Sequence, residues 1–126
     1  MSDLNRYACT GRLTRDPTLR APQPDRPVLS FSLAVNDLPR STAAGVREER
    51  ANFFDFVIFG RQAEALSPIL RKGMKVSVDG RLRHQVWEAE GQRRSRVEVV
   101  VDHLDILTPK GERQEPADAI DDGVGF

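Results

Sequence analysis

The chain has 126 residues, a hydrophobic fraction of 39%, a charged fraction of 30% and a formal net charge of zero. These values are typical of one globular domain with a modest core, and no apolar run approaches the roughly 20 residues of a membrane span. The N-terminus lacks the apolar stretch of a signal peptide, and the single cysteine, Cys9, cannot form an internal disulfide. We therefore expect a cytoplasmic protein.

The charge is unevenly distributed along the chain. Residues 1–110 carry 18 Lys and Arg against 14 Asp and Glu, whereas residues 111–126 carry one Arg against five acidic residues. A basic body with an acidic end predicts partners of opposite sign, or a tail that competes for the basic surface of the body. No core-forming periodicity follows residue 108, so we expect a domain over residues 1–108 and a disordered acidic tail over residues 109–126.

The first half of the chain predicts two strands separated by a loop. Residues 6–13 alternate loosely and place Tyr7, Cys9 and Leu13 on one face of a strand. Four prolines in residues 17–27 exclude a helix and favour an exposed loop. Residues 28–35 alternate clearly and predict a second strand, and the polar residues 36–52 predict a long hairpin loop.

A third strand is predicted at residues 53–59, where four of the six phenylalanines lie. Phe54, Phe56 and Ile58 share one face, which we expect to be core. Phe53 and Phe59 lie on the other face together with Asp55 and Val57. Two aromatic rings on the side away from the core need something to pack against. The spacing alone leaves three possibilities open, which are stacking on a ligand, a core strand that is buried on both faces, and burial in a subunit interface.

The second half predicts a short helix followed by a hairpin. Ala63, Leu66 and Leu70 recur at helical spacing. Pro68 interrupts this helix, and we expect a second short turn with Ser67 as its cap and Pro68 at its first position. Residues 75–87 and 94–101 read as two strands joined by a turn at residues 90–92. Five short strands with a helix between the third and fourth are typical of an all-β, five-stranded oligonucleotide-binding (OB) barrel.

The second predicted hairpin also carries a candidate binding site. Trp87, the single tryptophan, lies in a polar stretch with Arg81 and Arg83 before it and three arginines after it, at positions 93, 94 and 96. Basic residues clustered around exposed aromatic rings favour contact with phosphates. No phosphate-binding glycine loop, nucleophile elbow or metal-ligand spacing is present in the sequence, which argues against an enzyme.

Five segments in order resemble bacterial single-stranded DNA-binding proteins, and the likeness covers about residues 4–107 and the last few residues. These segments are residues 5–17, 31–36, 56–64, 70–73 and 78–83. The resemblance implies an OB fold assembled as a homotetramer, without catalysis or cofactor. It also implies sequence-tolerant binding of single-stranded DNA in DNA replication, recombination and repair, in the cytoplasm and in association with the nucleoid.

The resemblance further implies roles for individual residues. Phe53, Phe59 and Trp87 would stack on bases, whereas Pro39 falls where the family often has another aromatic residue. The candidates for phosphate contact are Arg61, Lys72 and Arg83, with Arg20, Arg40 and Arg94 in addition.

The chain end resembles the tip through which the family docks replication, recombination and repair proteins. The matching residues are Asp121, Asp122, Val124 and Phe126, with Gly125 where the family usually has Pro. A ring at an acidic chain end offers a partner both an apolar and a charged contact.

Two other functions remain open on the sequence. An OB-fold adaptor or primosome-type accessory protein would use the aromatic face as a protein interface. A cold-shock type of RNA-binding barrel would instead carry closely spaced aromatic RNA-binding motifs, which this chain lacks.

Overall fold

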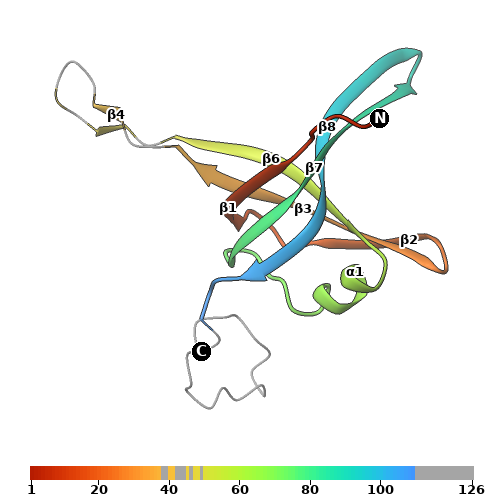
Figure 1. Ribbon diagram of the computed structural model, residues 1–126, viewed down its shortest axis with the longest axis horizontal. Coiled ribbons are helices and arrows are strands. Elements are labelled where there is room, and N and C mark those ends of the chain that lie inside the picture. Colours follow the sequence, from red (N-terminus) through yellow and green to blue (C-terminus); the bar gives the residue numbers. More distant parts are fainter. Residues whose placement is uncertain (38–39, 42–44, 46, 49, 110–126) are drawn as a thin grey trace.

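The computed structural model describes residues 1–37, 40–41, 45, 47–48 and 50–109, and Figure 1 shows how their elements are arranged. Within these residues the chain forms eight strands and one helix. Their bounds are β1 (Tyr7–Leu13), β2 (Thr18–Gln23), β3 (Arg26–Asn36), β4 (Arg40–Ser41), β5 (Arg47–Glu48), β6 (Ala51–Phe59), α1 (Arg61–Leu66), β7 (Lys75–Ala89) and β8 (Gln92–Ile106). The predicted all-β fold with a short helix after the third long strand is confirmed.

The main sheet closes into a barrel. Strands β1, β7, β8, β6 and β3 are neighbours in that order, and β3 pairs again with β1 through Arg12–Ala34 and Leu13–Leu33. The pairs are antiparallel except for β6 and β8, which run parallel at Phe56–Val99 and Val57–Val100. This closed five-stranded arrangement is that of the predicted OB barrel.

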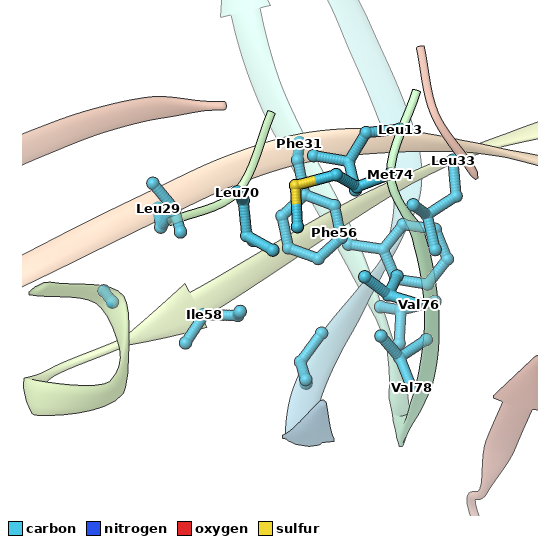
Figure 2. Close-up of a cluster of buried hydrophobic side chains, with 13 residues drawn as sticks. Leu13, Leu29, Phe31, Leu33, Phe56, Ile58, Leu70, Met74, Val76 and Val78 are labelled. Carbon is cyan, nitrogen blue, oxygen red and sulfur yellow. The ribbon is translucent and has the colours of Figure 1, made fainter. Parts of the chain in front are cut away.

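The barrel interior is filled by side chains from alternate strand positions, as the sequence predicts. Leu29, Phe31 and Leu33 of β3 are buried, and so are Phe56 and Ile58 of β6. Figure 2 shows these side chains clustered with residues of the other strands. The rings of Phe31 and Phe56 stack with their centroids 5.4 Å apart.

Phe54 is an exception to the predicted core. It lies on the same face of β6 as Phe56 and Ile58, yet 40% of it is exposed. Its ring packs edge-on against Tyr7, with centroids 5.8 Å apart. Alternation along a strand fixes the face on which a side chain lies but not its depth in the barrel, which explains the difference.

The proline-rich segment also differs from the prediction, because it forms strand β2 in place of a loop. β2 lies at the edge of the sheet and pairs with β3 through Thr18–Ser30, Leu19–Leu29 and Arg20–Val28. The proline of β2, Pro22, falls in the irregular stretch between Arg20 and Gln23. Proline is tolerated there because an edge strand or bulge needs no ladder N–H at that position. Within the predicted hairpin loop after β3, the short strands β4 and β5 pair with each other.

The helix is shorter than predicted. α1 ends at Leu66, and the predicted second helical turn beyond Ser67 is a hydrogen-bonded turn in which the N–H groups of Ile69 and Leu70 both donate to the Leu66 carbonyl. Ala63 and Leu70 are nevertheless buried against the barrel core, as their spacing indicates.

The β7–β8 hairpin determines where the second half of the candidate site lies. Each strand has 15 residues, and Figure 1 shows the hairpin projecting from the barrel. Its two-residue turn has positive φ at both Glu90 and Gly91, as a type I′ turn requires. A bulge between Asp79 and Gly80 shifts the register. At Gly80 a Cβ atom would lie 2.1 Å from the carbonyl oxygen of Val100, so the close approach of β7 to β8 requires glycine.

Candidate nucleic-acid interface

The outward face of β6 carries both of the predicted stacking phenylalanines. Phe53 is 67% exposed and Phe59 is 42% exposed. Between them Val57 is buried although it points away from the barrel core, and it lines a groove together with side chains of the neighbouring strands. The two rings therefore lie at opposite ends of the strand, with Asp55 and Val57 between them on the same face.

Phe59 lies in a groove of about 270 Å³ that runs across five strands. Arg20 of β2 and Arg83 of β7 are among its lining residues, as are Arg96 and Glu98 of β8. A smaller polar pocket of about 140 Å³ adjoins the groove and shares Arg20, Arg96 and Glu98 with it. Arg15 and Asp55 contribute to the lining of this pocket as well.

Each of two exposed rings is covered on one side by a guanidinium group. The Cζ atom of Arg83 lies 5.3 Å from the centroid of the Phe59 ring. The Cζ atom of Arg96 lies 5.8 Å from the centroid of the Trp87 ring. Trp87 is 42% exposed, like Phe59, so both rings keep accessible surface beside their arginine. A ring with a cation on one side and solvent on the other can accept a further flat group by stacking.

A buried carboxylate lies between the two arginines. The Glu98 side chain is 1% exposed and accepts hydrogen bonds at Oε1 from Nη2 of Arg83 (2.7 Å) and from Nε of Arg83 (3.3 Å). Nη2 of Arg96 lies 3.7 Å from Oε2 of the same carboxylate. The charge-assisted pair with Arg83 fixes the guanidinium in one orientation.

The predicted phosphate contacts are only partly brought together by the fold. Arg20 and Arg83 line the groove with Phe59, and Arg94 is directly opposite Trp87 in the hairpin register. Within the described residues, the lining of the groove includes neither Arg61 nor Lys72. Arg61 begins α1 immediately after the groove end of β6, and the backbone N–H of Lys72 donates to the Asp16 carboxylate, with 2.8 Å between the two atoms.

Several predicted residues lie outside the described part of the structure. They are Pro39, the side chain of Arg40, and the tail residues Asp121, Asp122, Val124 and Phe126. Two residues that were not predicted from the sequence also belong to this surface: Glu98 lines both the groove and the adjoining pocket, and Arg15 lines the pocket. Arg96 lines both as well, which gives it a more central place than Arg94. Counting back from the turn at Glu90 and Gly91 could have found Glu98, because that register places it opposite Arg83. Arg15 lies outside the hairpin, so this counting does not reach it.

A larger hollow, of about 380 Å³, lies elsewhere on the barrel over β1, β7 and β8. Its lining includes small side chains, His103 and the carboxylates of Asp79 and Asp105. Among the described residues that line it there is no Lys, Arg, Phe, Tyr or Trp, so it suits a nucleic acid less well than the groove does. At its edge Nδ1 of His103 lies 3.0 Å from the Asp79 carboxylate, which raises the pKa of His103. Arg6 pairs with Asp102 beside them, with 3.2 Å between the charged atoms.

Tyr7 and Cys9 lie next to this hollow on the inward face of β1, where both pack against the core. Burial, together with a side-chain hydrogen bond between the two residues, raises the pKa of the Tyr7 phenol to about 12. Burial also raises the pKa of the Cys9 thiol, which keeps it in the less reactive protonated form.

Among the described residues, no group of three or more His, Cys, Asp and Glu side chains could hold a metal ion. In the same part of the chain, α1 lacks the length and apolar character needed to cross a membrane.

Comparisons with known proteins find a matching family and similar proteins. The model of the Single-strand binding protein family matches residues 4–107. The chain is 42% identical over 107 residues to the single-stranded DNA-binding protein of Treponema pallidum, covering 85% of this chain and 60% of that protein. It is 42% identical over 116 residues to the single-stranded DNA-binding protein of Staphylococcus aureus, covering 91% of this chain and 72% of that protein.

Two solved structures share the fold. A deletion mutant of the single-stranded DNA binding protein from Thermus aquaticus superposes with a TM-score of 0.73 at 31% identity, over 86% of this chain and 52% of that chain. A Plasmodium falciparum protein, solved in complex with single-stranded DNA, superposes with a TM-score of 0.74 at 23% identity, over 85% of this chain and 97% of that chain. The matched region thus covers between about half and nearly all of the length of these four proteins.

Proposed function

Because this chain belongs to the single-strand binding protein family, we propose that it binds single-stranded DNA with little sequence preference. The observation that carries the proposal is the pair of exposed rings, Phe59 and Trp87, each backed by an arginine along one face of the barrel. Proteins of this family bind DNA without catalysing a reaction, in agreement with the sequence prediction that the chain is not an enzyme.

In this proposal the aromatic residues Phe53, Phe59 and Trp87 stack on bases. Stacking tolerates any sequence because every base has a π-face, and each stacked base contributes roughly 1–3 kcal/mol. Phe59 and Trp87 have a partly covered ring with one open side, whereas Phe53 is the most exposed of the three and lies nearer the β4–β5 hairpin. A DNA strand that follows the groove would meet Phe59 there, whereas the groove lining within the described residues includes neither Phe53 nor Trp87.

Phosphates in this proposal are contacted by the basic residues around the rings. Arg20 and Arg83 in the groove and Arg94 opposite Trp87 have the most direct support from the structure. Arg61, Lys72 and Arg40 extend the path to the helix, the adjoining turn and the β4–β5 hairpin. Arg15 and Arg96 join the set because they line the polar pocket next to the groove.

We further propose that the protein acts in DNA replication, recombination and repair as a homotetramer, in the cytoplasm and in association with the nucleoid. Residues 1–108 would form the DNA-binding domain and residues 109–126 an acidic tail. In the tail, Asp121 and Asp122 would meet a basic partner surface while Val124 and Phe126 enter an apolar pocket. The family resemblance supports these roles.

The fluorescence of Trp87, the single tryptophan, tests the DNA-binding proposal directly. Titration with a dT oligomer should quench the emission and shift the oligomer in a gel, whereas duplex DNA of the same length should quench it much less. The observed affinity should fall steeply with salt, because phosphate contacts release counterions.

Unchanged emission together with the absence of a gel shift would overturn the proposal. If, in addition, Phe53 and Phe59 were protected from solvent in the DNA-free oligomer, the aromatic face would be a protein interface. The adaptor function would then replace the DNA-binding function. Measuring the solution mass with and without the oligomer tests the homotetramer in the same samples.

A further inference from the structure

Glu98 is a charged residue buried in the middle of the candidate interface. Its side chain is 1% exposed, although it lies on the outward face of β8 and not in the barrel core. Burying a carboxylate is costly unless opposite charges and hydrogen bonds compensate. Here Arg83 and Arg96 provide the compensation, with closest distances of 2.7 Å and 3.7 Å to the two carboxylate oxygens.

The same two arginines cover the two rings that we propose as stacking platforms. Arg83 lies over Phe59 and Arg96 lies over Trp87. One carboxylate therefore connects both ring contacts through β6, β7 and β8. Phe59 is on β6, and its arginine is on β7. The carboxylate itself is on β8.

We propose that Glu98 is a positioning residue of the interface, which holds both guanidinium groups against their rings and so keeps the groove preorganised for single-stranded DNA. This inference rests on the proposed function. Arg83 uses Nε and Nη2 for Glu98, which leaves Nη1 available for a phosphate. Without the carboxylate, two long side chains would have to be ordered on binding, at a cost in affinity.

Charge and positioning predict opposite effects when Glu98 is neutralised. Removal of a negative charge from a surface that binds phosphates should by itself strengthen binding. Loss of positioning should weaken it. The sign of the change in affinity for DNA therefore separates the two roles of the carboxylate.

The test compares Glu98→Gln with the matched control Glu88→Gln. Glu88 is exposed on the same hairpin, opposite Arg93, so its replacement changes the charge equally without touching the ring contacts. We expect Glu98→Gln to bind a dT oligomer about tenfold more weakly than the wild type, whereas Glu88→Gln binds as well or slightly better. Binding by Glu98→Gln as tight as that of Glu88→Gln would overturn the inference.

A second pair of variants keeps the charge and changes only the shape of the cation. Arg83→Lys retains a positive charge but cannot offer Glu98 two N–H groups of a planar fork. Its control is Arg6→Lys, because Arg6 also pairs with a carboxylate, that of Asp102, but away from the groove. We expect weaker dT binding for Arg83→Lys and unchanged binding for Arg6→Lys. Equal affinities of these two variants for the dT oligomer would contradict the inference. This second comparison tests the inference even if Glu98→Gln does not fold.

The two proposals fail in distinguishable ways. If the wild type does not bind the dT oligomer, the proposed function is wrong and the inference falls with it. If the wild type binds and Glu98→Gln behaves like Glu88→Gln, the inference alone is wrong. The ordering of Arg83 by Glu98 can also be measured in the free protein, without DNA. The Arg83 Nε–H signal in an NMR spectrum should be protected from exchange in the wild type, and Glu98→Gln should lose this protection.

Discussion

Replacing Phe59 by alanine should weaken the binding of single-stranded DNA without changing its dependence on salt. Phe59 is 42% exposed and Arg83 lies over its ring, so we expect one base to stack on the surface of the ring that remains accessible. Loss of one stacked base costs roughly 1–3 kcal/mol, which corresponds to between about 5-fold and 160-fold in affinity. We expect a value near the middle, about 30-fold.

The same substitution should also lower the stability of the fold. Full burial of a phenylalanine side chain contributes about 1.5–3 kcal/mol, and a little over half of Phe59 is covered. The contact with Arg83 adds about 0.5–1 kcal/mol at a partly exposed site. The expected loss in the free energy of unfolding is therefore about 2 kcal/mol, so binding must be measured well below the melting temperature.

Phe54→Ala is the matched control for this experiment. Phe54 lies on the same strand and is 40% exposed, but its ring faces Tyr7 on the opposite side from the groove. We expect a similar loss of stability and less than a twofold change in affinity. Fluorescence anisotropy of a labelled dT oligomer at several salt concentrations measures both the affinity and the salt slope. The slope should not change, because no cation is removed.

Two results would refute this reasoning. If Phe59→Ala and Phe54→Ala weakened binding equally, the groove face would have no special role. If Phe59→Ala reduced the salt slope strongly, its main effect would be the displacement of Arg83, and stacking on the ring would contribute little.

Three further predictions concern the fold. The single tyrosine, Tyr7, should form its phenolate with a midpoint near pH 12 in the native protein and near pH 10 in urea, as measured by ultraviolet absorbance. Because the native ring resists ionisation, stability should fall as the pH rises from about 10 towards 12, and Tyr7→Phe should lose this dependence. The Asp79 carboxylate raises the pKa of His103, so this pair stabilises the fold fully below about pH 6.5, and the contribution is lost as the pH rises through the raised pKa. The difference in urea unfolding between wild type and His103→Gln should therefore be larger at pH 5.5 than at pH 8.5, and Asp79→Asn should remove it. Finally, Gly80→Ala should cost about 3 kcal/mol or more in thermal unfolding, since its Cβ would collide with the Val100 backbone. Gly91→Asn should cost less, about 1 kcal/mol, because the turn is open but its positive φ remains strained even for Asn.

Local patterning predicted most of the barrel from the sequence. The alternation of Leu29, Phe31 and Leu33 and the helical spacing of Ala63 and Leu70 identified side chains that are buried in the structure. These predictions succeed because burial on one face follows directly from the periodicity of a strand or helix.

The predictions failed where the outcome depends on neighbours that are distant in the sequence. β2 forms despite its proline because β3 offers it a free edge, and Phe54 is 40% exposed although it lies on the inward face of β6. The role of Glu98 was missed for a related reason, since an isolated glutamate in a predicted strand gives no sign of burial. Its pairing with Arg83 becomes visible only when the register of the hairpin is known.

The parallel seam between β6 and β8 is short, with Phe56–Val99 and Val57–Val100 in register, whereas β7 and β8 pair along nearly their whole length. The contact of Arg83 with Phe59 and the groove floor both cross this seam. Short pairings open first when a protein unfolds locally. We expect the amide hydrogens of Val57 and Val100 to exchange faster than those in the hairpin. A ligand in the groove would join the two sides of the seam, so its occupancy should be measurable as slower amide exchange in the barrel wall itself.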